Sequence, residues 1–511
     1  MKKRFLALLL LVVISCQKEE DIIDLSAINL TKVSFLKSNN SSLSADLEME
    51  FDGDKTFRGY VEFGTNLSQL VATYTFEGNT VFIGDIEQTS SVTKNNFSKE
   101  VVLTVRDNAS TGKDYNIRVM YYTGLPIVYI NTLGQEVVSK EEYISAEVSV
   151  YGGLDYVDID ETAIQIRGRG NSTWFDGSVT KKPYQIKFAD KTEVLGMPDD
   201  RRWVLLAEYW DRSLVRNMFS YEIGKISNFD YSPTGRFVEL FINNQPAGTY
   251  VIAQKIEESK NRVNIGDTGY LIEIDQRQRI DEDDVYFEPP IFRQKMEKFW
   301  WSDTIFNIKE PDVEQNSTAY RVIKNHVDDF ENTLFGNNFK DPDVGYRSFI
   351  DVDSFVDWYL INEMGKSVDA YGYASVFFTY EPGGTLKMGP IWDFDLSYGN
   401  ADYNANSFFI EGNWISEHPW FDRLLQDEYF KDLVSSRYLY YYEKKGQFID
   451  IIQGFSNKIK RSQKLNYEQY QNLGEPIWNN STAIFETHDE EVEYLQYWVE
   501  NRMNWMRGNL N

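Results

Sequence analysis

The order of two hydrophobic periodicities along these 511 residues is the feature that most constrains the fold. Short stretches in which apolar and polar residues alternate begin near residue 44, and strand-like and helix-like stretches mix after residue 124. Beyond about residue 318 helical spacing dominates, apart from two strand-like runs at 374–380 and 386–396. Alternation is typical of half-buried strands and helical spacing of amphipathic helices. Strands first and helices afterwards predict an α+β fold.

Residues 44–122 predict a small all-β domain. Alternating stretches such as "RGYVEFG" and "KEVVLTV" are separated by clusters of Gly, Asn, Asp and Ser. This spacing indicates an immunoglobulin-like β-sandwich. The domain offers no acid/base constellation, so we expect a spacer or adhesion role, with ligand binding as the alternative. The polar, Ser/Asn-rich residues 17–43 before it predict a tether.

The N-terminus predicts export. A basic tip at residues 2–4 precedes an apolar run at 5–14, which is too short to span a bilayer and resembles a secretory signal. The run ends in "VISC", which looks like a bacterial lipobox, and Cys16 is the single cysteine of the chain. We expect residues 1–16 to be a lipoprotein signal with Cys16 lipidated, and the protein to sit in the outer membrane or periplasm, at the cell surface. An ordinary cleaved signal is the alternative.

Charge and length set further limits. The formal net charge of -27 argues against nucleic acid as a partner, because phosphate contacts need clustered Lys and Arg. No second apolar run is long enough to cross a membrane, so membrane contact is expected through the lipid anchor only. The length predicts two or more domains, and 42% hydrophobic residues suffice for a sizeable core.

Two carboxylates flank a phenylalanine in "GPIWDFDLSYGN", residues 389–400. If the preceding apolar run is a strand, alternation places Asp393 and Asp395 on one side and Phe394 in the core. Two carboxylates on one face repel each other and favour a divalent cation with oxygen ligands, such as magnesium or calcium. The alternative is that one aspartate caps a turn and the other is solvated.

Asp369 is a second candidate. It ends the helix-like stretch "SFVDWYLINEMGKSVD", and one strand and one turn separate it from Asp393. A hairpin of that length brings Asp369 close to Asp393, with one carboxylate as a base and the other as a metal ligand. A surface helix cap is the simpler interpretation of Asp369 taken alone.

A third group of candidates lies earlier in the chain. In "RGRGNSTW" two glycines permit close approach of the backbone to a phosphate, while Arg167 and Arg169 supply charge. "KKPYQIKF" follows with Lys182 or Lys187 on the next strand, and Glu222 on the helix "DRSLVRNMFSYEIGK" could orient a lysine. A glycine-containing turn and a solvated helix face are the alternatives.

The order of these parts favours an enzyme. A glycine-bearing loop, a strand lysine, a helix glutamate, an aspartate and a strand that ends in an acidic motif follow one another as in protein-kinase-like phosphoryl transfer. Such chemistry needs positioning and charge neutralisation more than covalent catalysis.

Six stretches between residues 124 and 400 carry a more specific resemblance. They are "GLPIVYINT", "RGRGNSTW" with "KKPYQIKF", "WVLLAEYWDRSLVRN", "VELFINNQPAGTYVIAQKIE", "GYLIEID" and "GPIWDFDLSYGN". Together they resemble the spore-coat protein H (CotH) kinase family, in its exported bacterial lipoprotein form. The resemblance implies an atypical protein-kinase-like fold over residues 123–511, with a helical C-terminal part. It also implies transfer of the γ-phosphate of ATP to Ser or Thr of secreted or surface proteins, with Mg²⁺ or Mn²⁺.

The resemblance also implies roles for individual residues. Asp393 corresponds to the metal-binding aspartate and Asp369 to the catalytic aspartate, with Asp395 as an additional metal ligand. Lys187, with Lys182 as the alternative, and Glu222 correspond to the lysine and glutamate that serve the nucleotide.

The chain departs from the family pattern at one position. Family members often place an asparagine a few residues after the catalytic aspartate as a second metal ligand, whereas this chain offers only Ser375. A serine hydroxyl is a weaker, neutral ligand. The alternative function is therefore a non-catalytic surface lipoprotein, a pseudokinase for adhesion or glycan binding, and the expected partner is a protein acceptor or a surface glycan.

Overall fold

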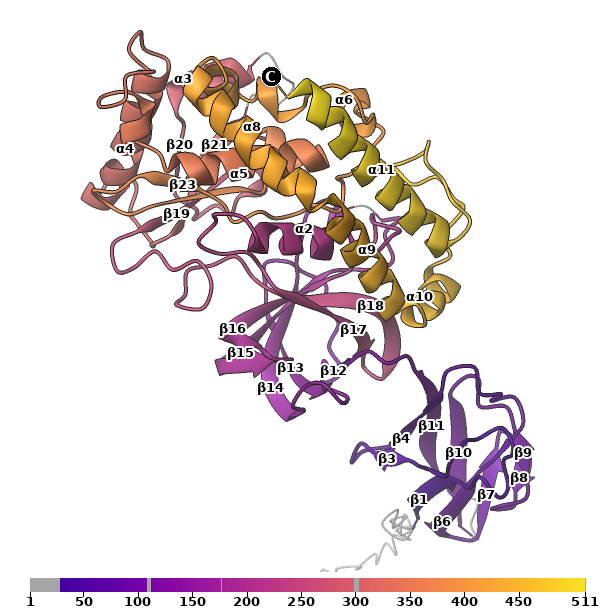
Figure 1. Ribbon diagram of the computed structural model, residues 1–511. Coiled ribbons are helices and arrows are strands. Elements are labelled where there is room, and N and C mark those ends of the chain that lie inside the picture. Colours follow the sequence, from indigo (N-terminus) through magenta and orange to yellow (C-terminus); the bar gives the residue numbers. More distant parts are fainter. Residues whose placement is uncertain (1–27, 108–111, 176, 298–302, 511) are drawn as a thin grey trace, which may run out of the picture. The chain divides into compact units, whose positions relative to one another are not determined.

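The computed structural model describes residues 28–107, 112–175, 177–297 and 303–510 (Figure 1). The predicted signal and the predicted lipidation site Cys16 lie outside these residues. The chain divides into two units, Met1–Thr123 and Gly124–Asn511. Strands dominate the first unit and the start of the second, and helices dominate the C-terminal part, so the fold is α+β.

The first unit consists of strands. Three form the sheet β2 (Leu47–Glu48), β1 (Asn29–Phe35) and β6 (Thr73–Glu77). Six form the sheet β3 (Glu50–Phe51), β4 (Thr56–Glu62), β11 (Gly112–Tyr122), β10 (Val101–Arg106), β7 (Thr80–Ile83) and β8 (Ile86–Gln88). A short pair joins β5 (Leu70–Val71) to β9 (Lys94–Asn95). The apolar residues that alternate in these strands form one buried core.

The predicted tether at residues 17–43 is wrong in its second half. Residues 29–35 form β1, which pairs with β6, and Val33 and Phe35 are completely buried. The polar composition of the surrounding residues concealed three apolar side chains, Leu30, Val33 and Phe35, whose spacing is interrupted by a bulge after Leu30. The domain therefore begins before residue 44.

The second unit begins with a closed barrel in the order β12 (Ile127–Asn131), β13 (Ile144–Tyr151), β14 (Ile159–Gly168), β15 (Tyr184–Val194), β16 (Met197–Leu206), β18 (Gln245–Gln254) and β17 (Gly235–Ile242). β17 and β18 form the predicted hairpin, with Asn243 and Asn244 in the left-handed conformation that a tight turn needs. The helix α2 (Arg216–Lys225) follows β16 in the chain.

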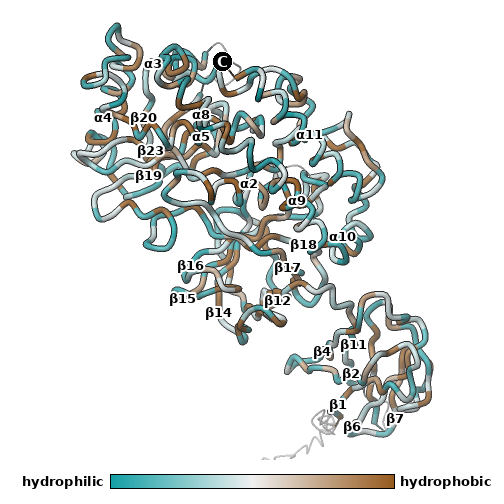
Figure 2. Tube along the Cα trace, in the orientation of Figure 1, coloured by the Kyte–Doolittle hydropathy of each residue, from teal (hydrophilic) through white to brown (hydrophobic). Residues whose placement is uncertain are grey.

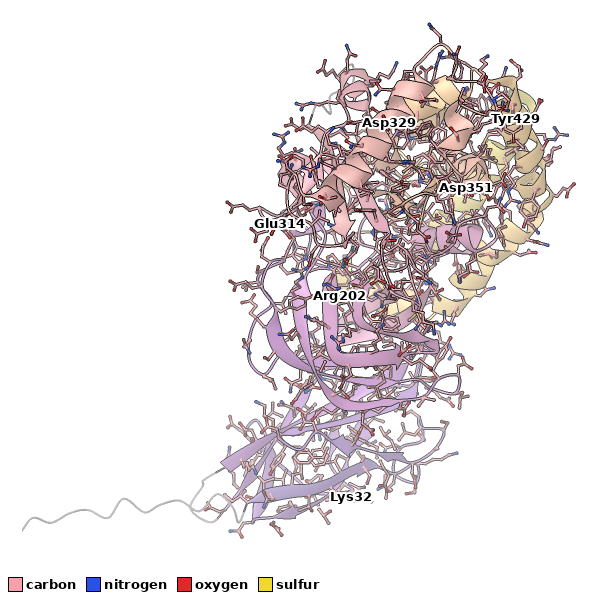
Figure 3. All side chains as sticks on the ribbon, turned by 90° about the vertical axis from the view of Figure 1, so that its left-hand side faces the viewer. Lys32, Arg202, Glu314, Asp329, Asp351 and Tyr429 are labelled. Atoms are coloured by element: carbon pink, nitrogen blue, oxygen red, sulfur yellow. The ribbon has the colours of Figure 1, made fainter. Side chains whose placement is uncertain are left out.

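A second sheet follows the barrel. Its order is β20 (Tyr286–Phe287), β21 (Thr304–Glu310), β19 (Tyr270–Gln276), β22 (Val376–Tyr380) and β23 (Leu386–Met388). Helix α5 (Val352–Gly365) packs against it and is buried on nearly all sides. Asp351, labelled in Figure 3, caps α5 by accepting a hydrogen bond from the backbone N–H of Ser354 at 2.8 Å.

The remaining helices are α1 (Ser172–Phe175), α3 (Pro290–Met296), α4 (Thr318–Leu334), α6 (Ala405–Phe408), α7 (Pro419–Leu424), α8 (Glu428–Glu443), α9 (Lys445–Ile459), α10 (Ser462–Tyr470) and α11 (His488–Asn509). α8 and α11 pack on α5, and α9 packs on α2 and α11, so the C-terminal helices cover α5 and α2 (Figure 1). Figure 2 shows the hydrophobic residues gathered around α5 and β20, inside this layer of helices. Among the described residues, no helix has the length and hydropathy needed to cross a membrane.

Candidate active site

The acidic residues singled out in the sequence lie near one another in the second unit. Asp369 begins the short 3-10 helix η4 (Asp369–Tyr371), four residues after the end of α5. Asp393 and Asp395 lie in the loop that follows β23. Asp369 and Asp395 each interact electrostatically with the negative charge of Asp393. The fold therefore brings together the three aspartates.

The loop at 389–396 differs from the predicted strand. β23 ends at Met388, and Asp393 has a left-handed backbone with φ of 67°. Aspartate tolerates this conformation better than most residues do. Phe394 is buried, as predicted, so the chain turns at Asp393 while keeping the phenylalanine in the core. The preceding helix is also shorter than predicted, because Lys366 adopts a left-handed conformation and ends α5 at Gly365.

Ser375 lies beside Asp393. Its hydroxyl donates a hydrogen bond to Oδ2 of Asp393 at 3.2 Å. Ser375 directly precedes β22 and, like Asp393, has a left-handed backbone, with φ of 60°. The hydroxyl and the carboxylate thus present oxygen atoms to the same small region.

Burial and mutual repulsion raise the pKa values of two of the aspartates. Burial is the main reason that the pKa of Asp369 rises to about 7; Asp393 adds to this and Arg279 opposes it. Burial, followed by repulsion from Asp393, places the pKa of Asp395 well above its ordinary value. Closely spaced carboxylates of this kind are stabilised by added positive charge.

Two arginines supply part of that charge. Arg169 is half-buried, and its guanidinium stacks over Trp392, 5.4 Å from the ring centroid. Burial lowers its pKa, and the charge of Asp393 opposes the shift. Arg279 makes an ion pair with Asp275 at 2.9 Å. Burial lowers the pKa of Arg279, but the charges of Asp275 and Asp369 outweigh this effect and raise it.

Glu208 and Asn217 complete the cluster. Asn217, on the helix that also carries Glu222, was a sequence candidate for contacting phosphate or capping a neighbouring loop, whereas Glu208 was missed. Asn217 donates its side-chain N–H groups to the Glu208 carboxylate and accepts the backbone N–H of Phe394 at 2.7 Å. Burial, reinforced by Asp211, raises the pKa of Glu208 to about 8, while Asn217 and Lys181 oppose the rise. Glu208 directly follows an apolar strand in the sequence, which is the same signal that singled out Asp393.

Four of the predicted nucleotide-binding residues lie elsewhere. Arg167 donates to the carbonyl of Glu141 at 3.2 Å, and Lys182 donates to the carbonyl of Thr173 at 2.6 Å. Lys187 faces Arg202, labelled in Figure 3, across the β15–β16 ladder. Both line a pocket of about 360 Å³ whose lining residues include none of the acidic cluster.

Glu222, which the sequence offered as a residue that could orient a lysine, makes no ion pair with Lys182 or Lys187 in the described part of the chain. Glu222 is half-buried and makes an ion pair with Lys225, one turn along the same helix, at 2.6 Å. Lys181, which sequence reasoning passed over, is the lysine whose charge acts on the acidic cluster, through Glu208. Its ammonium group donates to the carbonyl of Thr249, and burial lowers its pKa to about 7.

The glycines of "RGRG" serve packing and a turn. A Cβ atom on Gly168 would lie 2.3 Å from the Trp174 ring, so the glycine is needed for that contact. Gly170 has φ of 85°, a conformation that favours glycine. Arg169, which lies between the two glycines, interacts electrostatically with Asp393.

The chemistry of the donor set fits a hard divalent cation. Asp369, Asp393, Asp395 and Ser375 offer only oxygen atoms, which magnesium and calcium prefer. Within the residues that the structure describes, no group of three or more His, Cys, Asp or Glu side chains is placed so that it could hold a metal ion by itself. Magnesium does not need one, because it binds through one or two carboxylates together with substrate phosphates and water.

Fold and site together define a class: an α+β protein with a half-buried cluster of carboxylates and guanidinium groups beside a β-barrel. A family model described as "CotH kinase protein" matches residues 164–506. The chain therefore belongs to the CotH kinase family, whose members depend in general on a nucleotide and a metal. The resemblance found in the sequence is confirmed at this level.

The other comparisons add little. No curated protein matches the chain. A solved structure described as a "putative glycoside hydrolase" from Bacteroides thetaiotaomicron is 11% identical and covers 57% of this chain and 85% of that one, with a TM-score of 0.17.

Proposed function

We propose that the second unit is an atypical protein-kinase-like domain that transfers the γ-phosphoryl group of ATP to a hydroxyl group. The observation that carries this proposal is the convergence of Asp369, Asp393 and Ser375 beside two half-buried arginines. Phosphoryl transfer depends mainly on positioning and charge neutralisation, and this cluster offers both.

In this proposal Asp369 accepts the proton of the acceptor hydroxyl. Its raised pKa suits a group that gains and loses a proton near neutral pH. Asp393 and Asp395, with Ser375, would hold Mg²⁺ or Mn²⁺, which neutralises phosphate charge when bound. Arg169 supplies further positive charge toward the phosphates.

α2 has a positioning role. Asn217 at its start fastens Glu208 to the backbone of Phe394, between the two candidate metal ligands. Lys181 acts on Glu208 electrostatically, so this pair takes the place that the sequence assigned to Lys187 and Glu222.

The test is a phosphotransfer assay with γ-labelled ATP, Mg²⁺ or Mn²⁺ and candidate acceptors. Wild type and Asp489→Asn, an exposed carboxylate change on α11, should label acceptor equally. Asp393→Asn and Asp369→Asn should each lose at least about a hundredfold in rate, the scale expected for an acid/base or electrostatic group. Equal labelling by wild type and Asp393→Asn would contradict the proposal.

Ser375 favours a second function. If Ser375 binds metal weakly, the domain is a pseudokinase, used for adhesion or glycan binding. In that case no acceptor is labelled and Mg²⁺ with ATP leaves the melting temperature unchanged, while a glycan raises it.

We also propose that the protein is an exported lipoprotein, anchored at the cell surface through Cys16. The first unit, as an immunoglobulin-like β-sandwich, would act as a spacer. Metabolic labelling with a fatty-acid analogue tests the anchor, because Cys16→Ser should abolish incorporation.

A further inference from the structure

Four aromatic side chains, Tyr209, Trp210, Tyr403 and Trp478, form an aromatic platform. The rings of Tyr403 and Trp478 stack with centroids 5.1 Å apart and planes 24° apart. Trp210 meets Trp478 edge-on at 5.3 Å, and Tyr209 meets Trp210 at 5.0 Å. Trp210 is buried, but Tyr403 and Trp478 are 48% and 46% exposed. The platform therefore has a buried base and an exposed aromatic surface.

The platform lies next to the acidic cluster. The side-chain amide of Asn400 donates to the carbonyl of Asp395 at 2.7 Å and to the carbonyl of Trp210 at 2.8 Å. The same residue therefore joins the loop of the candidate metal ligands to the base of the platform. The charges of Asp369 and Asp395 also act on the Tyr403 hydroxyl.

The loop that carries Trp478 is held in place on both sides. The buried guanidinium of Arg212 donates to the carbonyl of Glu475 at 2.7 Å and to the carbonyl of Ala483 at 2.8 Å. Arg212 also makes a buried ion pair with Glu491 of α11 at 2.8 Å. An exposed aromatic ring on a loop fixed by a buried charge is preorganised, which reduces the entropy lost on binding.

The surroundings of the platform indicate the ligand. Aromatic faces carry partial negative charge and pack well against the C–H face of a sugar ring. The carboxylates beside them accept hydrogen bonds and repel anions, so they match the hydroxyl groups of an uncharged ligand. A cationic side chain also packs on aromatic faces. Arg169 and Arg279 already place positive charge beside these carboxylates, and this charge disfavours a cationic ligand. A ligand with hydroxyl groups is therefore the better match.

We propose that the aromatic platform binds a neutral pyranose ring and that this carbohydrate is the acceptor of the phosphoryl group. The second part rests on the proposed function. The sugar hydroxyl oxygen forms the new bond to the γ-phosphorus of the nucleoside triphosphate, and the bond from that phosphorus to the β,γ-bridging oxygen breaks. The hydroxyl proton passes to Asp369, and the nucleoside diphosphate leaves.

The test measures binding of the full chain to neutral hexasaccharides of glucose, mannose and N-acetylglucosamine by tryptophan fluorescence and calorimetry. At least one should bind, with affinity at least tenfold weaker in both Trp478→Ala and Tyr403→Ala. Tyr497→Ala, which removes a 58% exposed ring from α11, is the matched control and should bind like wild type. Equal thermal unfolding of the variants shows that they fold.

Three results would overturn the inference: no hexasaccharide binds wild type, Trp478→Ala binds as tightly as wild type, or only hexalysine binds in a manner that depends on Trp478. Melting shifts with Mg²⁺ and ATP separate the two proposals. Saccharide binding without a nucleotide effect removes the proposed function but keeps the platform as a carbohydrate site. A nucleotide effect without saccharide binding removes the platform inference alone.

Discussion

The side-chain oxygen of Asn217 accepts a hydrogen bond from the backbone N–H of Phe394 at 2.7 Å, so the start of α2 is fastened between Asp393 and Asp395. The other end of the same amide donates to Glu208. A single amide thus fixes the loop of the candidate metal ligands relative to the barrel.

Asn217→Ala should lower both stability and activity. It leaves the buried Phe394 N–H and the Glu208 carboxylate without this partner, which costs about 1–3 kcal/mol per buried polar group. Chemical denaturation and the phosphotransfer assay measure the two effects. Asn457→Ala, an exposed change on α9, is the control and should alter neither. Full activity in Asn217→Ala would show that the hydrogen bonds of the Asn217 amide do not position the site.

Ser375→Asn should strengthen metal-dependent nucleotide binding. The left-handed backbone at Ser375 suits asparagine, so the change adds an amide oxygen beside Asp393 without backbone strain. We expect the melting shift caused by Mg²⁺ and ATP to increase, and to decrease in Ser375→Ala. Similar shifts in all three proteins would place the metal away from this side chain.

Gly168→Ala should destabilise the loop that carries Arg169. The new methyl group would lie 2.3 Å from the Trp174 ring, and forced overpacking costs about 1–3 kcal/mol. Gly177→Ala, in the same loop, meets nothing within 4 Å and is the matched control. Thermal unfolding of the two variants should therefore differ, and equal melting temperatures would mean that Trp174 moves freely.

Local pattern was enough to find the three aspartates. Each carboxylate follows an apolar helix or strand, so burial of the preceding residues forces the charge toward the protein interior. Chain order then predicted that Asp369 and Asp393 meet. The same pattern holds for Glu208 after β16. The role of the glutamate that serves the nucleotide was nevertheless assigned to Glu222, because Glu222 lies on a predicted helix.

The lysine could not be chosen from the sequence. Lys181, Lys182 and Lys187 all lie on or before β15, and their positions along the strand do not reveal which face of a closed barrel meets the cluster. Lys187 alternates with the buried Ile186 and Phe188 and points out of the barrel core, toward a different pocket. Closure of the barrel by strands distant in sequence decides which lysine acts on the acidic cluster, and no local sequence pattern predicts that closure.

The prediction of a tether at residues 17–43 was wrong in part for a related reason. Residues 29–35 contain apolar side chains, but β1 gains its stability from β6, about forty residues later. A single strand with polar neighbours is a weak local signal, because the partner strand supplies its hydrogen bonds and half of its burial.

His418 should make stability fall in acid. Its ring is completely buried among Phe292, Trp358, Trp420 and Phe421, and neither ring nitrogen has a hydrogen-bond partner within the described residues. Burial lowers the pKa of His418 from 6.5 to about 3, so between these values the unfolded chain binds one proton more than the native chain. This contribution to the free energy of unfolding is fully present above pH 6.5 and is lost as the pH falls, by about 2 kcal/mol from pH 7 to pH 5.

His418→Phe keeps an apolar ring among the surrounding aromatic side chains and should remove that part of the pH dependence. The measurement is the difference in unfolding free energy between wild type and variant at each pH. Parallel curves for the two proteins from pH 7 to pH 5 would show that the buried ring gains its proton in the folded state as readily as in the unfolded one.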